Sequence, residues 1–362
     1  MAGPPARPTS RPPSPGASST ACVSSSVGCE RIGTAGAKAG WTRPRVPPVK
    51  IEVHGDGPPE PDCRCAACAR ARAAGGRPEP LRVLLDGVPA QECPRRPVPG
   101  GHEVRAPGGG LVLAAGGPGD RPEPAAGPPH GPHQPYDAVL LDLAGVPEHL
   151  GLLRRTGAVG PATAVHAVHT GHRLPPAELA RRLGWWRRPA AGPYRTLLLG
   201  GVRSGKSAEG ELRLMAHPDV TYAATGGARP GDAEWAARVA AHRGRRPAWW
   251  RTVETTDLPG LLETARGAVL IDGIGGWLTA VLDEAGGWDD PSAAASRIDE
   301  LVDAWRGARA RVVAVSEEVG LAPVALTRAG RIFTDLLGRL NQRLAAESEE
   351  AALVVAGRVL DL

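Results

Sequence analysis

The segment Gly200-Gly201-Val202-Arg203-Ser204-Gly205-Lys206-Ser207 decides the fold of the second half of this chain. It fits the phosphate-binding loop (P-loop) pattern G-x-x-x-x-G-K-[ST], and the apolar residues 195–199 before it predict a β-strand. In such a loop, backbone N–H groups turn toward a phosphate, Lys206 adds a positive charge and the Ser207 hydroxyl is a ligand for Mg²⁺. Lysine is scarce elsewhere, since nearly all of the 43 basic residues are arginine. The segment therefore predicts nucleotide binding.

Length and composition restrict the classes of protein to which the chain can belong. Its 362 residues are enough for two domains and a tail. Hydrophobic residues make up 42% and aromatic residues only 4%, so Leu, Val and Ala must fill the core. The net charge of +5 suits anionic small molecules and does not require nucleic acid, so we expect no nucleic-acid partner.

The location of the protein is predicted from its apolar segments and its cysteines. No apolar stretch approaches the roughly 18 residues of a membrane span, and the N-terminal residues lack the apolar core of a secretory signal. A secreted disulfide-rich protein would distribute its cysteines through the fold. Here all six lie within the first 93 residues, at Cys22, Cys29, Cys63, Cys65, Cys68 and Cys93. We therefore expect a cytoplasmic protein without a membrane span.

The chain divides into three regions by composition. Residues 1–49 are rich in Pro, Ser and Gly and predict a disordered tail. Residues 50–192 contain strand-like runs at 81–86, 111–113, 138–143 and 164–168, separated by long Gly/Pro stretches, which predict a degenerate, loop-rich α+β region. Residues 193–362 have a different pattern and predict a separate domain.

In residues 193–362, strand-like and helical runs alternate. The strands are expected at 195–199, 220–224, 268–272, 312–316 and 353–355, and the helices at 207–216, 232–242, 293–306 and 335–346. Such alternation indicates an α/β fold of the P-loop NTPase type, a mostly parallel sheet with flanking helices.

Two further residues of this domain carry chemistry. Asp272 ends the apolar run 268–272, where P-loop proteins place a carboxylate that orients Mg²⁺, so Ser207 and Asp272 are the candidate metal ligands. Asp232 is a candidate N-cap for a helix that carries His242 near its end, with Arg243, Arg245 and Arg246 close by. A neutral imidazole beside arginines and a nucleotide is able to attack phosphorus, which makes His242 the candidate nucleophile.

Together with the loop, an ordered set of segments resembles one enzyme family. The set comprises Thr225, Asp272 and the runs at 238–243, 246–249, 251–254, 315–320 and 338–345. They are similar to the bifunctional adenosylcobinamide kinases/adenosylcobinamide-phosphate guanylyltransferases of cobalamin biosynthesis. The similarity runs in order from Arg195 to the C-terminus, nearly half of the chain.

This resemblance implies two reactions and a set of site residues. A nucleoside triphosphate, GTP or ATP, phosphorylates adenosylcobinamide, and GTP then gives its guanylyl group to a histidine, from which the product adenosylcobinamide-GDP is formed. His242 stands where the family has this histidine, and family members form homotrimers. The nucleotide contacts carry over to Gly200, Gly201, Val202, Arg203, Ser204, Gly205, Lys206, Ser207, Thr225, Gly226, Gly227, Arg243, Gly244, Arg245, Arg246, Glu254 and Asp272.

The sequence also departs from the family pattern. Family members usually have Asn where Glu317 stands, and Cys and larger residues where Gly273, Gly275 and Gly276 follow Asp272. Residues 321–329 match the usual loop only in part. We expect these departures to affect the corrinoid side of the site more than nucleotide binding.

The N-terminal half offers weaker signals. Residues 51–57 and 63–68 resemble metallo-β-lactamase-like regions fused to some relatives, but the H-x-H-x-D-H metal motif of that fold is missing. The cysteines at 63–68 and the histidines His166, His169 and His172 are expected to be structural or vestigial rather than metal ligands. Residues 181–188 mix arginine with tryptophan and predict an interdomain linker rather than a nucleic-acid contact.

Two rival functions stay open at this stage. One is a single-activity P-loop kinase in which His242 only packs, and the other is a nucleotide-binding regulatory or vestigial module. If residues 1–190 are an appendage, their deletion is expected to leave kinase activity intact.

Overall fold

The computed structural model describes residues 48–55, 66–76, 79–115, 135–168, 174–187, 192–227, 231, 233–321 and 323–362. The chain separates into two compact units, Met1–Pro44 and Arg45–Leu362, and the first lies outside the described residues. The tail predicted at 1–49, apart from its last two residues, and the N-cap predicted at Asp232 also lie outside them.

A seven-stranded sheet forms the centre of the C-terminal half, in the order β11-β10-β12-β13-β9-β14-β15. All neighbouring strands are parallel except the last pair, β14 and β15. This confirms the predicted α/β fold with a mostly parallel sheet. The strands are β9 (Tyr194–Gly200), β10 (Val220–Ala224), β11 (Arg251–Glu254), β12 (Ala268–Asp272), β13 (Arg311–Glu317), β14 (Glu350–Val355) and β15 (Arg358–Asp361).

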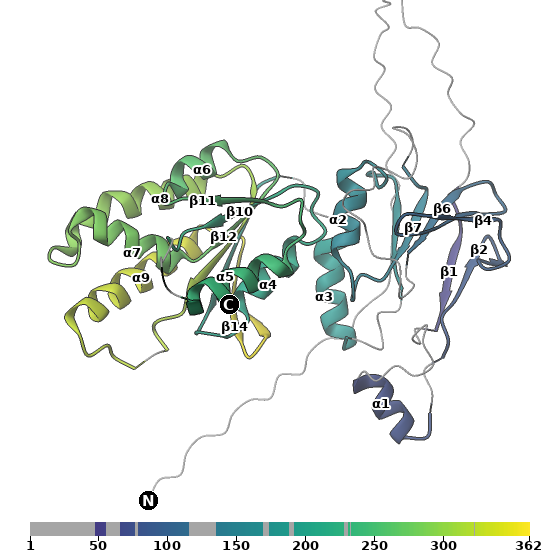
Figure 1. The fold of residues 1–362 in the computed structure, drawn as a ribbon, viewed down its shortest axis with the longest axis horizontal. Helices are drawn as coiled ribbons and strands as arrows, with labels where there is room; N and C mark the ends of the chain where they lie inside the picture. The colour runs from purple at the N-terminus through teal and green to yellow at the C-terminus, as the bar shows by residue number, and fades with distance from the viewer. Residues whose placement is uncertain are drawn as a thin grey trace, which may run out of the picture. The chain divides into compact units, whose positions relative to one another are not determined.

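Helices cover both faces of this sheet, with α6 to α9 on one side and α4 on the other (Figure 1). Successive side chains of a strand point to opposite faces. Leu197 and Leu199 therefore pack toward α6–α9, whereas Leu198 between them packs toward α4. The helices are α4 (Lys206–Leu214), α5 (Ala233–Arg245), α6 (Leu258–Thr264), α7 (Ile274–Ala285), α8 (Ala295–Gly307) and α9 (Arg328–Ala346), with a 3₁₀ turn at Pro291–Ala294. Burial on both faces explains why the central strands β9, β12 and β13 carry apolar runs without alternation.

The described residues of the N-terminal half form two smaller sheets and three helices. Strands β1 (Ile51–His54), β2 (Arg82–Leu85) and β3 (Val88–Pro89) form an antiparallel sheet. A five-stranded sheet has the order β4-β5-β6-β7-β8 and is parallel only from β6 to β8. Its strands are β4 (Arg95–Val98), β5 (Gly101–Arg105), β6 (Leu111–Ala115), β7 (Ala138–Leu141) and β8 (Ala164–Ala167), and the helices are α1 (Ala66–Ala73), α2 (Glu148–Arg155) and α3 (Pro176–Arg187).

This half is better packed than the sequence predicted. Leu113, Val139, Leu141 and Leu150 are buried in one apolar cluster, and a second cluster surrounds Leu85. The predicted strand-like runs correspond to β2, β6, β7 and β8. The α+β character of the region is thus confirmed, and its described part has a core of its own.

Residues 181–187, for which the sequence predicted an interdomain linker, form the end of helix α3 and pack against α4. Trp186 is fully buried and its Nε1 donates a hydrogen bond to the Leu212 carbonyl at 2.9 Å. Arg181 lies 2.7 Å from the Glu209 carboxylate, and the guanidinium groups of Arg181 and Arg213 each lie 4.4 Å from the centre of the Trp185 ring. The arginine and tryptophan side chains of this segment therefore form contacts between helices α3 and α4.

His217, which follows α4, makes the stability of the fold depend on pH. Burial, with the charges of Arg311 and Arg154, lowers its pKa to about 4, and its Nε2 has no hydrogen-bond partner among the described residues. The unfolded chain binds a proton near pH 6.5 that the folded chain binds only near pH 4. Above pH 6.5, His217 is neutral in both states and its protonation costs no stability. As the pH drops to 4, the free energy of unfolding is expected to fall by about 3 kcal/mol.

Denaturant unfolding at several pH values measures this effect. The variant His217→Leu removes the titrating group, so its unfolding free energy is expected to vary less between pH 6.5 and 4. An unchanged slope in this variant would contradict the assignment to His217. His102→Ala, which removes an exposed histidine on β5, is the matched control and is expected to keep the slope.

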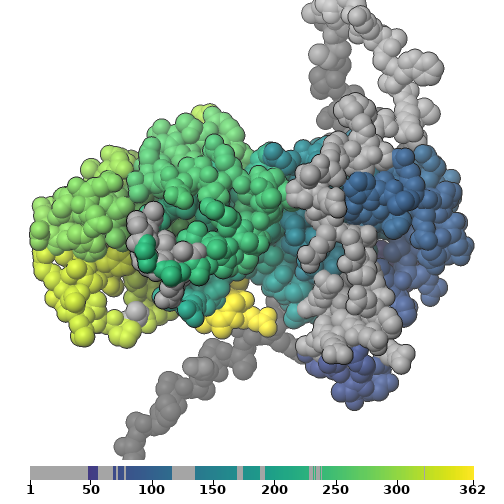
Figure 2. Space-filling model, viewed as in Figure 1, coloured from purple at the N-terminus to yellow at the C-terminus, as the bar shows by residue number. Residues whose placement is uncertain are grey.

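The C-terminal hairpin β14–β15 lies at one edge of the large sheet, and its last residues, in bright yellow, lie at the surface (Figure 2). Its apolar side chains Val355, Leu360 and Leu362 are more than half exposed. Within the described part of the chain, no helix has both the length and the apolar character that a membrane span requires.

Candidate functional site

The P-loop joins β9 to α4. Gly205 has a φ of +99°, a left-handed conformation that favours glycine, and α4 begins directly after it at Lys206. The turn β14–β15 supports the loop, since the Gly357 N–H donates to the Ser204 carbonyl at 2.8 Å. The Lys206 ammonium donates to the Gly201 carbonyl at 3.2 Å. The loop thus has the strand, turn and helix that its sequence pattern requires.

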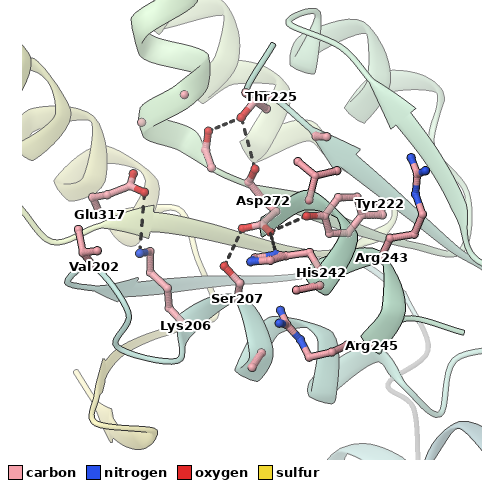
Figure 3. Close-up of a pocket in the computed structure, with 18 of the residues that line it drawn as sticks. Val202, Lys206, Ser207, Tyr222, Thr225, His242, Arg243, Arg245, Asp272 and Glu317 are labelled. Atoms are coloured by element: carbon pink, nitrogen blue, oxygen red, sulfur yellow. Dashed lines mark hydrogen bonds and ion pairs between the residues drawn. The ribbon is translucent and has the colours of Figure 1, made fainter. Parts of the chain in front are cut away.

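Asp272, at the end of β12, is the centre of the site (Figure 3). Its Oδ1 accepts a hydrogen bond from the Ser207 hydroxyl at 2.9 Å, and its Oδ2 accepts one from the Tyr222 hydroxyl at 2.5 Å. The Nδ1 atom of His242 lies 3.2 Å from the same Oδ2. One carboxylate therefore connects the P-loop helix, strand β10 and helix α5.

The protonation states of this cluster follow from burial and hydrogen bonding. Burial alone raises the pKa of Asp272, but hydrogen bonds from His242, Tyr222 and Ser207 outweigh it, so the pKa lies below its ordinary value. Burial and the nearby Asp272 charge raise the pKa of Tyr222 far above its ordinary value. Asp272 is thus a stable anion and Tyr222 a neutral donor at neutral pH.

Helix α5 and the residue after it bring the predicted arginines to the site. Arg245 donates from Nε to Glu211 at 2.7 Å, and burial raises the pKa of Glu211 although this contact opposes the shift. The Arg246 guanidinium stacks on the Tyr222 ring, 3.5 Å from its centre, and its Nε donates to the His242 carbonyl. These contacts fix the end of α5, and with it His242, against the P-loop helix and β10.

A cavity of about 1180 Å³ surrounds this cluster. Most of the residues predicted from sequence line it, as far as the described residues show: Val202, Arg203, Ser204, Gly205, Lys206, Ser207, Thr225, Gly226, His242, Arg243, Arg245, Arg246, Glu254 and Asp272. Gly200, Gly201, Gly227 and Gly244 are not part of this lining. The structure thus brings the phosphate loop and the candidate nucleophile into one cavity.

Several residues of the site were missed by sequence reasoning. Tyr222, Thr252 and Phe333 line the cavity, and the buried Glu211 holds Arg245 from behind. The sequence offered one signal for Tyr222, because the chain has only three tyrosines and this one lies two residues before the strand β10 ends. Nothing in the sequence pairs Glu211 with Arg245, which lie 34 positions apart.

The positions at which we expect departures from the family pattern also lie at this cavity. Gly275, Gly276 and Glu317 belong to its lining, together with Gly273, whose φ of +112° forms the N-terminal cap of α7. The Thr225 hydroxyl donates to the Gly273 carbonyl. All four positions therefore belong to the lining of the cavity that holds the P-loop and His242.

The metal candidates in the N-terminal half gain no support from the described residues. Cys68 and Cys93 are buried, while Cys63, Cys65, His169 and His172 lie outside the described residues. Within the described part of the chain, no three His, Cys, Asp or Glu side chains are grouped so as to hold a metal ion. The resemblance of this half to metallo-β-lactamase-like regions stays a prediction.

Comparison with known proteins finds relatives of the C-terminal half. Residues 196–362 match the profile of the family described as cobinamide kinase / cobinamide phosphate guanyltransferase. The bifunctional adenosylcobalamin biosynthesis protein CobU of Salmonella typhimurium is 41% identical over 174 residues, which cover 44% of this chain and 95% of the relative. The chain belongs to this family. It is therefore a transferase of the cobinamide kinase and guanyltransferase type.

Two further members of the cobinamide kinase family show the same coverage. CobU of Escherichia coli is 37% identical over 174 residues, and CobP of Pseudomonas aeruginosa is 38% identical over 175 residues. Each match covers less than half of this chain but at least 95% of the relative. The N-terminal half described above is thus additional to the part that these cobinamide kinase relatives share.

Proposed function

We propose that the chain catalyses both reactions of its family in cobalamin biosynthesis, phosphorylation of adenosylcobinamide and guanylyl transfer to the resulting phosphate. One observation carries this proposal: Asp272 links Ser207 of the P-loop and His242 within a single cavity. A kinase without guanylyl transfer has no need of a histidine at this place. The arrangement therefore favours the bifunctional enzyme over a kinase in which His242 only packs.

In the first reaction, the P-loop would hold the triphosphate of GTP or ATP. Backbone N–H groups of the loop and the positive end of α4 favour negative charge at this position. Lys206 supplies the only ammonium group among the residues that line the cavity in the described chain, and it reaches the terminal phosphate as a point charge. These groups stabilise the charge that develops on the phosphoryl group during transfer.

In the second reaction, His242 would attack the α-phosphorus of GTP. The Asp272 carboxylate accepts a hydrogen bond from the Nδ1–H group of His242. This favours the tautomer in which Nε2 of His242 carries the free lone pair. A bond forms between Nε2 and phosphorus, the bond to pyrophosphate breaks, and the positive charge on the imidazole lies against the Asp272 anion. The corrinoid phosphate then displaces the histidine, and the cavity arginines hold the anionic groups in place.

The residues present fit a magnesium ion bound with the nucleotide. Ser207 and Asp272 offer a hydroxyl and an ionised carboxylate 2.9 Å apart, which are the oxygen donors that Mg²⁺ prefers. We propose that these two side chains hold the ion. When bound, it neutralises charge on the phosphates.

Turnover of adenosylcobinamide by the full chain tests the proposed function. With GTP as the nucleotide, both the phosphorylated and the GDP-linked products are expected, and a parallel reaction with ATP identifies the phosphate donor. Formation of the first product alone would support the single-activity kinase. Tight nucleotide binding with neither product would support the vestigial module.

We also propose a cytoplasmic homotrimer, as the family resemblance implies. The half-exposed apolar residues of the β14–β15 edge offer a surface that assembly would cover. Light scattering on the purified protein is expected to give three times the chain mass of 37.5 kDa, and a monomer mass would refute the trimer.

A further inference from the structure

Helix α3 of the N-terminal half lies against the P-loop helix α4, and one of its side chains reaches the first turn of α4. Glu209 belongs to this turn, since its backbone N–H donates to the Gly205 carbonyl at 2.9 Å. The Arg181 guanidinium binds the Glu209 carboxylate, with Nη1 2.7 Å from Oε1 and Nη2 3.4 Å from Oε2. Helix α3 is therefore bonded to α4 only two positions after Ser207, the last residue of the phosphate loop.

Arg181 is held firmly in this position by its own helix. Its Nε and Nη2 donate to the Glu178 carboxylate at 2.9 Å and 2.8 Å. Its guanidinium also stacks on Trp185, 4.4 Å from the centre of the ring. Paired bonds between a guanidinium and a carboxylate fix orientation as well as distance. Arg181 is therefore a defined connection between the two helices rather than a mobile surface ion pair.

Glu209 depends on this connection because it is a buried anion. Its side chain is only 8% exposed, and its other cationic partner is Arg213, whose Nε lies 2.9 Å from Oε1. Arg213 also binds Glu350 of β14. Without Arg181, one arginine would have to balance two carboxylates. A buried carboxylate that loses its cation is costly, so the first turn of α4 is expected to shift or to carry an uncompensated charge.

We propose that Arg181 is a positioning residue for the phosphate loop, and that the N-terminal half thereby sets the affinity for the nucleotide. This inference rests on one part of the proposed function, the binding of a nucleotide by the P-loop. The N-terminal turn of α4 favours the negative charge of phosphate, and it carries Lys206 and Ser207. Arg181 holds this turn and cancels the charge of Glu209 within it. An uncompensated carboxylate there would repel the phosphates.

The proposed coupling acts in both directions, because linkage between two binding events is reciprocal. If the contact with α3 raises the affinity for the nucleotide, a bound nucleotide must strengthen the contact with α3 by the same factor. A helix that only completes the apolar core would not respond to the nucleotide. The N-terminal half would thus influence the reaction although none of its described residues lines the cavity.

The test measures nucleotide affinity in the full chain, by calorimetry with a non-hydrolysable GTP analogue and magnesium. Arg181→Met keeps an apolar stem and removes the charge, so Kd is expected to rise by about fivefold or more. At saturating nucleotide, kcat for phosphorylation is expected to change by less than about threefold, because Arg181 touches no reacting atom. Arg181→Lys restores the charge without the paired bonds and is expected to recover part of the affinity.

The neighbouring arginine provides a matched control. Arg182 also lies on α3, and its ion pair is with Glu178, at 2.6 Å. Arg182→Met therefore removes the same kind of side chain from the same helix but leaves the bond to Glu209 in place. It is expected to keep Kd within about twofold of the unmodified chain.

Hydrogen exchange followed by mass spectrometry gives a second measurement, which needs no substitution. Addition of the GTP analogue is expected to slow exchange of the α3 amides in the unmodified chain. This slowing is expected to be lost in Arg181→Met. Strands β4 and β5 are the internal reference and are expected to exchange at the same rate with and without the nucleotide.

Three results would overturn the inference. A Kd for Arg181→Met within about twofold of the unmodified value shows that the contact does not reach the phosphate loop. Equal weakening by Arg182→Met assigns the effect to general damage of α3. Exchange of α3 that does not respond to the nucleotide shows that the helix only packs. Failure of the proposed function is recognised separately, as nucleotide binding that depends on Arg181 but yields neither product.

Discussion

Replacement of His242 by alanine is expected to abolish the covalent guanylyl-enzyme and to lower guanylyl transfer by about 10³-fold or more, because no other group would attack phosphorus. Phosphorylation of adenosylcobinamide is expected to persist, since the P-loop stays in place. The measurement is incubation with α-labelled GTP, followed by quantification of an acid-labile, base-stable label on the denatured protein.

A matched control separates this effect from general damage. His102→Ala removes an exposed histidine of β5 and is expected to leave the label unchanged. Asp272 gives a second comparison, since Asp272→Asn removes the charge that fixes the imidazole and is expected to weaken both reactions. Retention of the label by His242→Ala would refute His242 as the nucleophile and leave the single-activity kinase as the better reading.

The parts of the site that were predictable from sequence are those encoded by neighbouring residues. The P-loop is contiguous, and its strand, turn and helix follow from local chemistry. Asp272 followed from its position at the end of an apolar strand. The hydrogen bond between Tyr222 and Asp272 spans 50 positions and depends on two strands being adjacent, which no local pattern states.

The same distinction explains the errors in the fold. Helix α9 begins at Arg328, seven residues before the predicted start at 335, because the Thr327 side chain caps it by accepting from the Gly330 N–H. The glycine at 330 argued against a helix in isolation. Residues 181–188 were interpreted as a linker because they lie just before the strand predicted at 195–199, and only the surface of α4 shows why this segment carries both arginine and tryptophan.

Replacement of Trp186 by alanine is expected to lower the free energy of unfolding by about 3–5 kcal/mol. The Trp186 side chain is fully buried in a cluster with Leu150, Leu153 and Ala216. Its backbone carbonyl also accepts a hydrogen bond from the Arg154 guanidinium at 2.7 Å. A cavity of this size cannot close without moving α3 from α4. Thermal unfolding followed by circular dichroism is expected to show a Tm lower by roughly 10 °C.

Trp288→Ala is the matched control, because Trp288 is only partly buried and its Nε1 bonds an exposed Asp283. Trp288→Ala is expected to lower the free energy of unfolding by less than Trp186→Ala does, and an equal or larger loss would contradict the role assigned to α3.

The contact between α3 and α4 also predicts the effect of truncating the chain. Removal of α3 would deprive the buried Glu209 of Arg181 and would uncover the surface of the P-loop helix that Trp186 contacts. A chain starting at residue 193 is therefore expected to lose stability and with it kinase activity, contrary to the expectation for a dispensable appendage.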